Sequence, residues 1–133
     1  MDIHALDHLV LTVRDIGRSC DFYKEVLDME IRTTGGNRKA IHFGNSKINL
    51  HQQGAEFRPH AQAPTPGSAD LCFLTKTPID TIISRLQKHQ VKLIKGPVQR
   101  IGATGDLFSI YFRDPDGNLL EVANILPSST TPL

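Results

Sequence analysis

Hydrophobic and polar positions along the chain define one order of elements that occurs twice. Each copy opens with a short β-rich run, at residues 6–13 in the first copy and 69–74 in the second. Apolar residues at helical spacing follow each run, and further short runs of alternating character come after them. The pattern predicts a repeated unit of one strand, one helix and three strands. Two unrelated α+β halves are the alternative interpretation.

The boundaries of the first copy are marked by capping and turn residues. Asp15 offers a side-chain cap for a helix. The apolar stripe of that helix comprises Ile16, Cys20, Tyr23 and Leu27. Three strands are expected at residues 29–34, 39–43 and 47–52, because glycine and asparagine separate these segments.

The second copy repeats this order. Thr77 and Pro78 start its helix, whose buried stripe comprises Ile79, Ile82, Ile83 and Leu86. A strand is expected at residues 92–94, and an irregular glycine-rich loop that contains Arg100 should follow it. The last two strands are expected at 106–113 and 118–125, joined by the turn sequence DPDG. In the matching of the copies, residues 41–44 correspond to 110–113 and residues 48–50 to 120–122.

A chain of 133 residues can bury one core but not two independent ones. The expected organisation is therefore a single domain spanning residues 1–133. It contains a first module at about 5–53, a linker at 55–67, a second module at about 68–125 and a frayed tail at 126–133.

Charge and composition exclude several classes of partner. The 15 basic and 14 acidic residues leave a formal charge of +1, which indicates neither nucleic acid nor an anionic membrane as a partner. No apolar run approaches the ~20 residues of a membrane span, and the first residues lack the pattern of a signal peptide, so a cytoplasmic location is expected. Cys20 and Cys72 are expected to be small buried side chains.

Strand parity gives the polar residues a common geometry. His8, Asp70 and Glu121 lie within strands, and Asn49 shares a strand face with His51. Glu121 interrupts apolar neighbours and therefore needs a partner. Two imidazoles and one carboxylate with open positions suit a divalent Fe, Mn, Ni, Zn or Co ion. Taken alone, each residue is also compatible with an ordinary surface or hydrogen-bonded role.

Three segments resemble one known family. They are LDHLVLTV at residues 6–13, FYKEVL at 22–27 and YFRDPDGNLLE at 111–121. They look like the vicinal oxygen chelate superfamily, which includes glyoxalase I, extradiol dioxygenases, and fosfomycin- and bleomycin-resistance proteins. Within it, RKA at 38–40, KINLH at 47–51 and PTPGSADL at 64–71 are most similar to glyoxalase domain-containing protein 5 and its bacterial relatives.

The resemblance implies an α+β fold of paired βαβββ modules whose curled mixed sheets enclose a divalent metal, with modules of two chains combining in a homodimer. The positions that match the family's ligands are His8, Asn49, Asp70 and Glu121. Glyoxalase I typically has a carboxylate where Asn49 stands, and many relatives have histidine where Asp70 stands. His51 is a candidate for the missing nitrogen ligand, so the predicted metal residues are His8, His51, Asp70 and Glu121.

Residues on the third strand of each module line the substrate pocket of relatives. Tyr111 and His42 are therefore candidates for orienting substrate or moving a proton, and Arg100 for meeting an anionic substrate. Half-buried strand packing is the alternative for the first two residues, and an exposed loop position for Arg100.

Three functional classes remain open, and all take a small molecule as partner. The first is a metal-dependent lyase or isomerase, thiol transferase or extradiol dioxygenase whose substrate chelates the metal through adjacent oxygens. The second is a metal-free protein that sequesters a small molecule. The third is a structural or regulatory module with a vestigial site.

Overall fold

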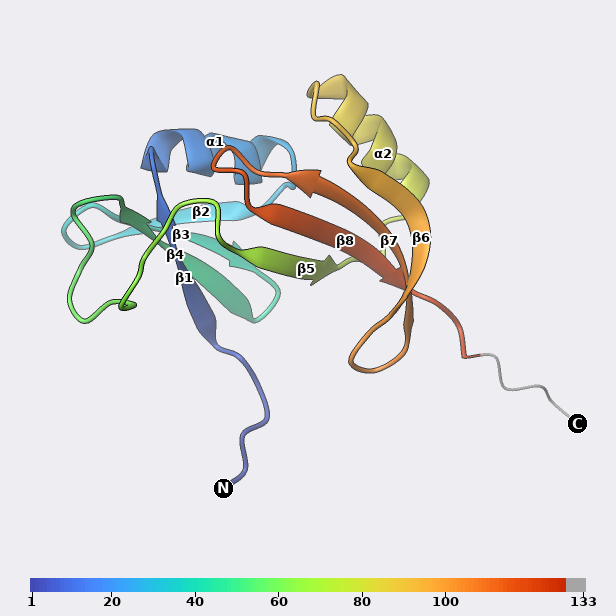
Figure 1. The fold of residues 1–133 in the computed structure, drawn as a ribbon, viewed down its shortest axis with the longest axis horizontal. Helices are drawn as coiled ribbons and strands as arrows, with labels where there is room; N and C mark the ends of the chain where they lie inside the picture. Colours follow the sequence, from blue (N-terminus) through green and yellow to red (C-terminus); the bar gives the residue numbers. More distant parts are fainter. Residues whose placement is uncertain (129–133) are drawn as a thin grey trace, which may run out of the picture. The chain divides into compact units, whose positions relative to one another are not determined.

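The structure is a computed structural model that describes residues 1–128, and it contains two four-stranded sheets with one helix each (Figure 1). The elements of the first half are β1 (His8–Val13), α1 (Ile16–Glu25), β2 (Glu30–Thr34), β3 (Arg38–Phe43) and β4 (Ser46–Gln52). Those of the second half are β5 (Asp70–Leu74), α2 (Ile79–Lys88), β6 (Lys95–Ile101), β7 (Asp106–Arg113) and β8 (Leu119–Ile125). The predicted βαβββ repeat and the α+β fold class are confirmed.

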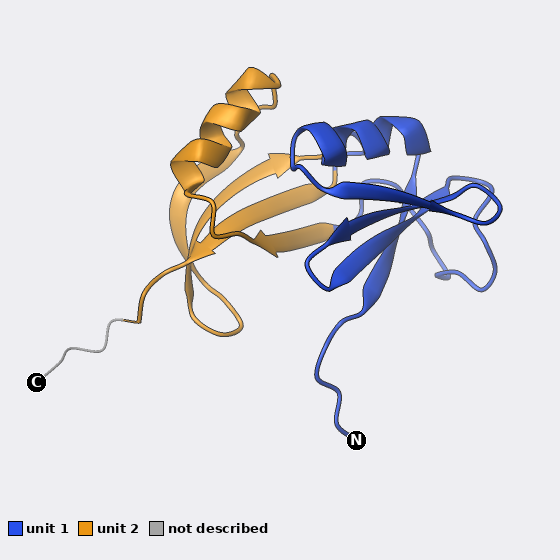
Figure 2. Ribbon diagram, turned by 180° about the vertical axis from the view of Figure 1, so that it is seen from behind, with its two compact units in different colours: residues 1–69, 115–117 blue, residues 70–114, 118–133 orange. Residues whose placement is uncertain are grey.

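Both sheets have the same topology. Their strand orders are β1-β4-β3-β2 and β5-β8-β7-β6. The first strand of each half pairs in parallel with the last one, and the remaining pairs are antiparallel. Figure 2 shows the two compact units of the chain, residues 1–69 with 115–117 and residues 70–114 with those from 118 on. Residues 129–133 of the predicted tail lie outside the described residues.

The first unit has its core between α1 and strands β2 to β4. Tyr23 of the helix is fully buried, as are Ile41 and Ile48 of the sheet. The side chain of Asp15 accepts a hydrogen bond from the backbone N–H of Arg18 at 3.1 Å, which confirms the predicted helix cap. The opposite side of this sheet, which carries His8, Asn49 and His51, is called here the open face of the first sheet.

The second unit has its core between α2 and strands β7 and β8. Ile79 and Leu86 of the helix are buried, together with Ile110, Phe112 and Leu120 of the sheet. Because side chains alternate along a strand, Glu121 points away from this core. The side of the sheet that carries Asp70, Glu121 and Tyr111 is the open face of the second sheet. Neither α1 nor α2 is long and apolar enough to cross a membrane.

The prediction for the segment around Gly96 was wrong. A strand was expected at residues 92–94 and a loop after it, whereas β6 spans Lys95–Ile101 and includes Arg100. Pro97 has no N–H to donate, but β6 is an edge strand and its pairing with β7 shifts between Lys95 and Val98, so the sheet tolerates the proline. Gly96, at φ 110°, leaves room for the backbone of Ser109, which a Cβ would approach to 2.5 Å.

The predicted matching of residues 41–44 with 110–113 was also wrong. Asn49 lies opposite Ala40, whereas Glu121 lies opposite Tyr111. Tyr111 therefore corresponds to Ala40, and His42 corresponds to Arg113. The physical reason is the turn, because Phe43 pairs with Ser46 across a tight turn while the turn from β7 to β8 is longer.

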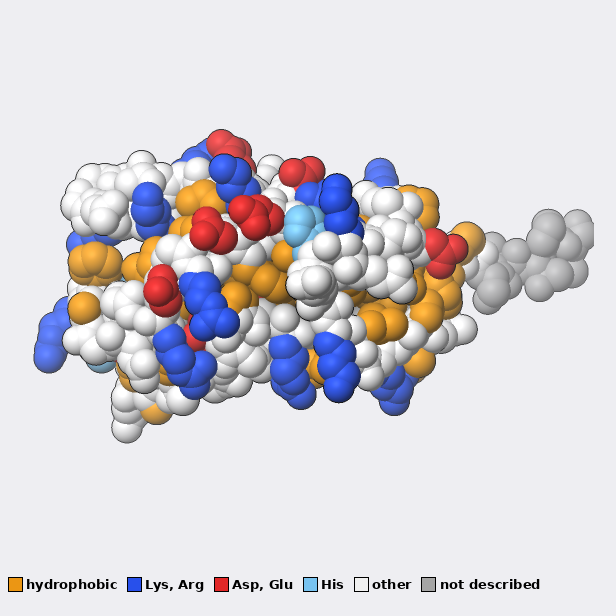
Figure 3. Space-filling model, turned by 90° about the horizontal axis from the view of Figure 1, so that it is seen from above, with side chains coloured by type: hydrophobic (Ala, Val, Ile, Leu, Met, Phe, Trp, Pro, Cys, Tyr) orange, Lys and Arg blue, Asp and Glu red, His pale blue; other side chains and the backbone are white. Residues whose placement is uncertain are grey.

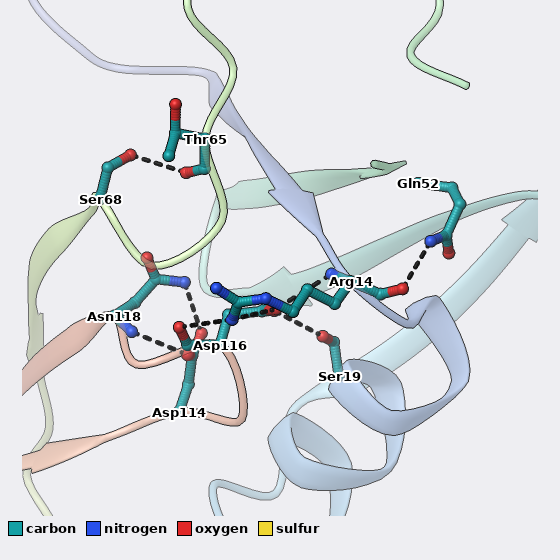
Figure 4. A network of polar contacts seen from close by, with 8 residues as sticks. All are labelled: Arg14, Ser19, Gln52, Thr65, Ser68, Asp114, Asp116 and Asn118. Atoms are coloured by element: carbon teal, nitrogen blue, oxygen red, sulfur yellow. Dashed lines mark hydrogen bonds and ion pairs between the residues drawn. The ribbon is translucent and has the colours of Figure 1, made fainter. Parts of the chain in front are cut away.

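The turn between β7 and β8 contains a buried polar network (Figure 4). Asn118 donates to both carboxylate oxygens of Asp114, through its backbone N–H at 3.0 Å and its side-chain amide at 2.8 Å. Asp116, grouped with the first unit, accepts hydrogen bonds from the backbone N–H of Arg14 at 2.9 Å and from the Ser19 hydroxyl at 3.4 Å. The Arg14 guanidinium donates to the Asp116 carbonyl at 3.1 Å.

Replacing Asp116 by alanine is expected to lower the free energy of unfolding by on the order of 2–4 kcal/mol. The carboxylate is buried, and its removal leaves the Arg14 N–H and the Ser19 hydroxyl without their acceptor. Urea unfolding followed by circular dichroism measures the change. Asp21→Ala, at an exposed position of α1, is the control and should change the unfolding free energy by less than about 0.5 kcal/mol. Equal midpoints for the two variants would contradict this reading of the turn.

Candidate functional site

A row of three polar side chains crosses the open face of the second sheet. Glu121 on β8 lies opposite Cys72 on β5 and opposite Tyr111 on β7. Because directly opposite residues point to the same side, the thiol, carboxylate and phenol are neighbours. Cys20 is buried as expected, but the expectation for Cys72 was wrong, because Cys72 is exposed. Only the strand register shows that Cys72 and Tyr111 are both neighbours of Glu121.

The carboxylate of Glu121 has one oxygen that lacks a protein partner. The Cys72 thiol is hydrogen-bonded to this carboxylate. The other oxygen, Oε2, is buried and accepts no hydrogen bond from any residue among 1–128. A buried carboxylate oxygen without a donor is costly, so a cation or a proton donor at this position would stabilise it.

Asp70 supplies a second carboxylate on the same face. It stands two residues before Cys72 on β5 and pairs with Leu119, which places it diagonally to Glu121. Diagonal neighbours have Cβ atoms roughly 7–8 Å apart or slightly less, within reach of one ion for side chains of this length. Asp70 is exposed, so its carboxylate is accessible from solvent.

Tyr111 is held in place by Arg100. The Arg100 Nε donates to the Tyr111 hydroxyl oxygen at 3.0 Å, and the guanidinium carbon lies 5.6 Å from the centre of the tyrosine ring. Since the phenol oxygen accepts this bond, its own O–H is left to donate to a further group. Arg100 is half-buried within β6 and is not an exposed loop residue.

On the first sheet, His8 is oriented by its neighbour in the chain. The His8 Nδ1 lies 2.8 Å from the carboxylate of Asp7. This hydrogen bond is the main cause of a lowered pKa of Asp7. A histidine that uses Nδ1 on a carboxylate presents Nε2 outward, which is the usual arrangement of metal-binding histidines.

His51 does not lie beside His8. His8 pairs with Lys47, whereas His51 pairs with Thr12 four residues further along the parallel strands. At ~3.3 Å per residue the two histidines are about 13 Å apart along the sheet. Their side chains stand roughly perpendicular to it, so within one chain they are not placed to bind the same ion.

His51 packs against an aromatic side chain of the linker. Its Nδ1 is buried without a hydrogen-bond partner in residues 1–128, and its ring meets the edge of Phe57 with centroids 5.4 Å apart. Burial is the main cause of a lowered pKa of His51. Phe57 belongs to the linker, and no sequence pattern marked it as part of a site.

The two remaining candidates lie elsewhere on the open face of the first sheet. Asn49 pairs with Val10, two residues beyond His8, just as Glu121 pairs two residues beyond Asp70. The register therefore places His8 and Asn49 as it places Asp70 and Glu121. His42 pairs with Lys47, which in turn pairs with His8, so a lysine stands between the two histidines.

The four predicted metal residues are divided between the units. His8 and His51 belong to the first unit, and Asp70 and Glu121 to the second. Among the described residues, no group of three or more His, Cys, Asp or Glu side chains is arranged to hold a metal ion. In the second unit, Asp70 and Glu121 share one face as a carboxylate pair.

Cys72 is expected to react slowly with iodoacetamide. Partial burial of the thiol, followed by the charge and hydrogen bond of Glu121, raises the pKa of Cys72 to about 11, although the residue as a whole is exposed. At about pH 8 only about one thiol in a thousand would then be ionised, against about a quarter for an ordinary cysteine, so alkylation should be roughly 20-fold slower. Mass spectrometry after timed labelling measures the rate.

Cys72→Ser provides the background for this experiment, because Cys20 is buried. Labelling of Cys72 as fast as that of a cysteine in a short peptide would show that its thiol is not held against Glu121.

Comparison with known proteins identifies the family of the chain. Residues 5–122 match the model of the Glyoxalase/Bleomycin resistance protein/Dioxygenase superfamily. Virulence protein STM3117 of Salmonella typhimurium is 55% identical over 92% of this chain and 85% of that protein. Its crystal structure has a TM-score of 0.92 at 54% identity, covering 95% of this chain and all of that chain (100%).

Two further relatives are more distant. Glyoxalase domain-containing protein RDO1 of Mycosarcoma maydis is 47% identical over 93% of this chain and 70% of that protein. Metallothiol transferase FosB of Staphylococcus epidermidis is 29% identical over 92% of this chain and 82% of that protein. The finer resemblance to glyoxalase domain-containing protein 5 stays a prediction. The chain belongs to the glyoxalase, bleomycin resistance protein and dioxygenase superfamily, the vicinal oxygen chelate proteins.

Proposed function

We propose that the protein is a divalent-metal-dependent enzyme that acts on a small substrate able to chelate the metal through adjacent oxygens. The observation that carries the proposal is the buried Oε2 of Glu121, which has no partner among residues 1–128. A divalent cation would supply the missing charge at this oxygen. Asp70 on the same face adds a second oxygen ligand.

The proposed ligands are Glu121, Asp70 and His8. Carboxylates and imidazole fit Fe, Mn, Ni, Zn or Co, and the hydrogen bond to Asp7 fixes the His8 ring for such a role. Asp70 is included because it shares a face with Glu121, and His51 is left out because it lies about 13 Å along the sheet from His8. When bound, the ion would act as a Lewis acid that polarises substrate oxygens.

The residues beside Glu121 have separate proposed roles. Tyr111, whose oxygen accepts from Arg100, would donate its proton to a substrate oxygen or orient it. Cys72 remains a neutral thiol because of its raised pKa, so it would hold Glu121 in place and would not act as a nucleophile. His42 lies on the open face of the first sheet and is a second candidate for proton transfer.

Three reaction types are proposed: thiol transfer, a lyase or isomerase reaction, and extradiol cleavage of a catechol. The relative FosB is named a metallothiol transferase, which supports a thiol-transferase reading alongside the lyase or isomerase and extradiol dioxygenase readings. The family match covers the whole superfamily and does not choose among these three reaction types.

A second candidate function is metal-free sequestration of a small molecule. It is favoured by the apolar part of the second open face, where Leu74 is 57% exposed and Ile125 is 50% exposed. An apolar ligand could bury these two side chains without any metal. A vestigial site in a structural module is a third possibility, and it predicts that replacing His8 and Glu121 together changes no binding or activity.

Metal analysis followed by a substrate panel tests the proposal. Protein purified without chelators should carry close to one equivalent of a divalent metal per chain. The panel comprises methylglyoxal with thiols, fosfomycin with thiols, and catechols with Fe(II). Turnover in one arm that disappears in EDTA supports the enzyme, whereas metal-free protein that remains inactive after metal addition overturns it.

We also propose that the protein forms a homodimer. Val10 on the first open face is 45% exposed, and the second open face exposes the apolar side chains of Leu74 and Ile125. Open sheet faces and edges of this kind are normally covered by a partner. Light scattering at high micromolar concentration should give twice the chain mass of 14.7 kDa. A mass of 14.7 kDa under these conditions would contradict the dimer.

A further inference from the structure

Cys72 places a sulfur atom beside the two carboxylates of the proposed metal centre. It lies directly opposite Glu121 on the neighbouring strand, and its thiol is hydrogen-bonded to that carboxylate. Asp70 stands two residues earlier on β5 and points to the same side. Besides burial and Glu121, the charge of Asp70 contributes to the raised pKa of the Cys72 thiol, so both carboxylates act on this sulfur. Asp70, Cys72 and Glu121 are called here the thiol–carboxylate cluster, and all three belong to the second unit.

The negative charge of this cluster is not balanced by a basic side chain. None of the ion pairs formed within residues 1–128 includes Asp70 or Glu121, and Oε2 of Glu121 is buried without a hydrogen-bond donor. The face drawn in Figure 3 shows the contrasting arrangement, with several Asp and Glu side chains lying next to Lys or Arg. Because Cys72 and Asp70 are both exposed, an ion can reach the cluster from solvent. A cation is therefore the partner that the cluster lacks.

Support of Glu121 by a hydrogen bond does not by itself account for a sulfur atom at this position. A thiol is a weak hydrogen-bond donor, and a serine hydroxyl at the same place would donate to the carboxylate more strongly. The property that distinguishes a thiol from a hydroxyl here is its affinity for soft metal ions. Cys72 can thus hold Glu121 in the metal-free protein and take a second part when an ion is bound.

We infer that Cys72 is a further ligand of the proposed metal ion and directs the site toward thiophilic metals such as Zn(II), at the expense of Mn(II). The inference rests on the proposed metal-dependent function and adds a sulfur ligand to it. A thiol that coordinates a metal loses its proton, so the ion takes the place of the proton that Cys72 shares with Glu121, and that proton passes to solvent. Carboxylate oxygens alone suit Mn(II), whereas a thiolate favours softer ions.

The side chains of the cluster must turn to meet at one ion. In the described part of the chain, no three such side chains surround a metal position as they stand. Asp70 is exposed, so its carboxylate can turn toward Cys72 and Glu121 without disturbing the core. An ion that takes more than four ligands keeps open positions for a chelating substrate beside these three residues and His8.

Absorption spectroscopy tests the inference, because a thiolate-to-metal charge-transfer band appears only when sulfur binds the ion directly. Metal-free, reduced protein is titrated with Co(II) and with Cd(II), and calorimetry measures binding of each ion. Wild-type protein should develop the band in step with binding, and Cys72→Ser should not. Serine keeps a donor for Glu121, so the substitution removes the sulfur but not the hydrogen bond. The affinity for Cd(II) should fall roughly tenfold or more, and that for Mn(II) should stay within about threefold.

Cys20→Ser is the matched control, because Cys20 is the other thiol of the chain and is buried in the first unit. It should keep both the band and the Cd(II) affinity of the wild type, and circular dichroism checks the fold of each variant. A measurement without any variant is the alkylation of wild-type protein, in which bound Cd(II) should slow the labelling of Cys72 further.

The possible failures can be told apart. Co(II) binding without a charge-transfer band in wild-type protein would overturn the inference and leave the metal proposal standing. So would a band that persists in Cys72→Ser, or bound Cd(II) that leaves the alkylation of Cys72 unchanged. Absence of any binding of Co(II), Cd(II) and Mn(II) would overturn the metal proposal and the inference together.

Discussion

Glu121→Gln protein is expected to bind Mn(II) or Zn(II) at least about 100-fold more weakly than the wild type. Replacing groups that merely support a metal ligand typically costs 10–100-fold in affinity, so loss of a ligand itself should cost at least as much. Glutamine keeps the size of the side chain and one oxygen but removes the negative charge. Calorimetric titration of metal-free protein measures the affinity, with Glu25→Gln at an exposed position of α1 as the control.

In the Glu121→Gln variant, the alkylation rates of Cys72 and Cys20 also show whether the protein is folded. The charge and hydrogen bond of Glu121 both contribute to the raised pKa of the thiol. Removing that charge should lower this pKa and accelerate alkylation, while a folded core keeps Cys20 protected. Equal metal affinity of Glu121→Gln and wild-type protein, together with faster alkylation of Cys72 and continued protection of Cys20, would reject Glu121 as a ligand in a folded protein.

Asp70→Asn and His8→Gln should follow the same trend if these residues complete the site. His4→Gln is the control for the histidine, because His4 is exposed and precedes β1. A loss in Glu121→Gln with no change in either of the other two would show that Glu121 takes its partners from elsewhere.

Most of the fold could be predicted because each helix and strand buries one face, and this burial imposes a regular spacing of apolar residues in the sequence. Both helices and all the strands except β6 lie where alternation or helical spacing indicated. The β6 segment failed because Gly96 and Pro97 normally indicate a loop. Here an edge position and a shift in pairing accommodate the proline, and neither feature is visible in local sequence.

The sequence could predict which face of a sheet each candidate side chain lies on. It could not predict how far along the strand each one lies relative to residues on other strands. Parity correctly placed Asn49 and His51 on one side, yet only the pairing of His51 with Thr12 shows that it lies far from His8. Register depends on turn lengths and on contacts between distant strands. For the same reason, the matching of His42 with Tyr111 was wrong, and the contacts of Phe57 with His51 and Arg38 were not foreseen.

Acidification should separate the enzyme from the sequestering protein. A histidine ligand must be neutral to coordinate, so protons compete with the metal and its affinity should fall as the solution is taken from about pH 8 to about pH 5. Catechol, which chelates through adjacent oxygens, should lose its binding together with the metal. Nile red, which would be held only by apolar side chains such as Leu74 and Ile125, should not.

Stability must be followed over the same range, because His51 also responds to pH. Burial lowers the pKa of His51, so the unfolded chain takes up its proton at higher pH than the folded chain does. The contribution of His51 to stability is therefore complete above the ordinary histidine range and is lost as the pH falls through its lowered pKa. Circular dichroism at each pH identifies any unfolding. Catechol binding that changes neither with pH nor with EDTA, in protein that stays folded, would overturn the metalloenzyme proposal and leave sequestration as the function.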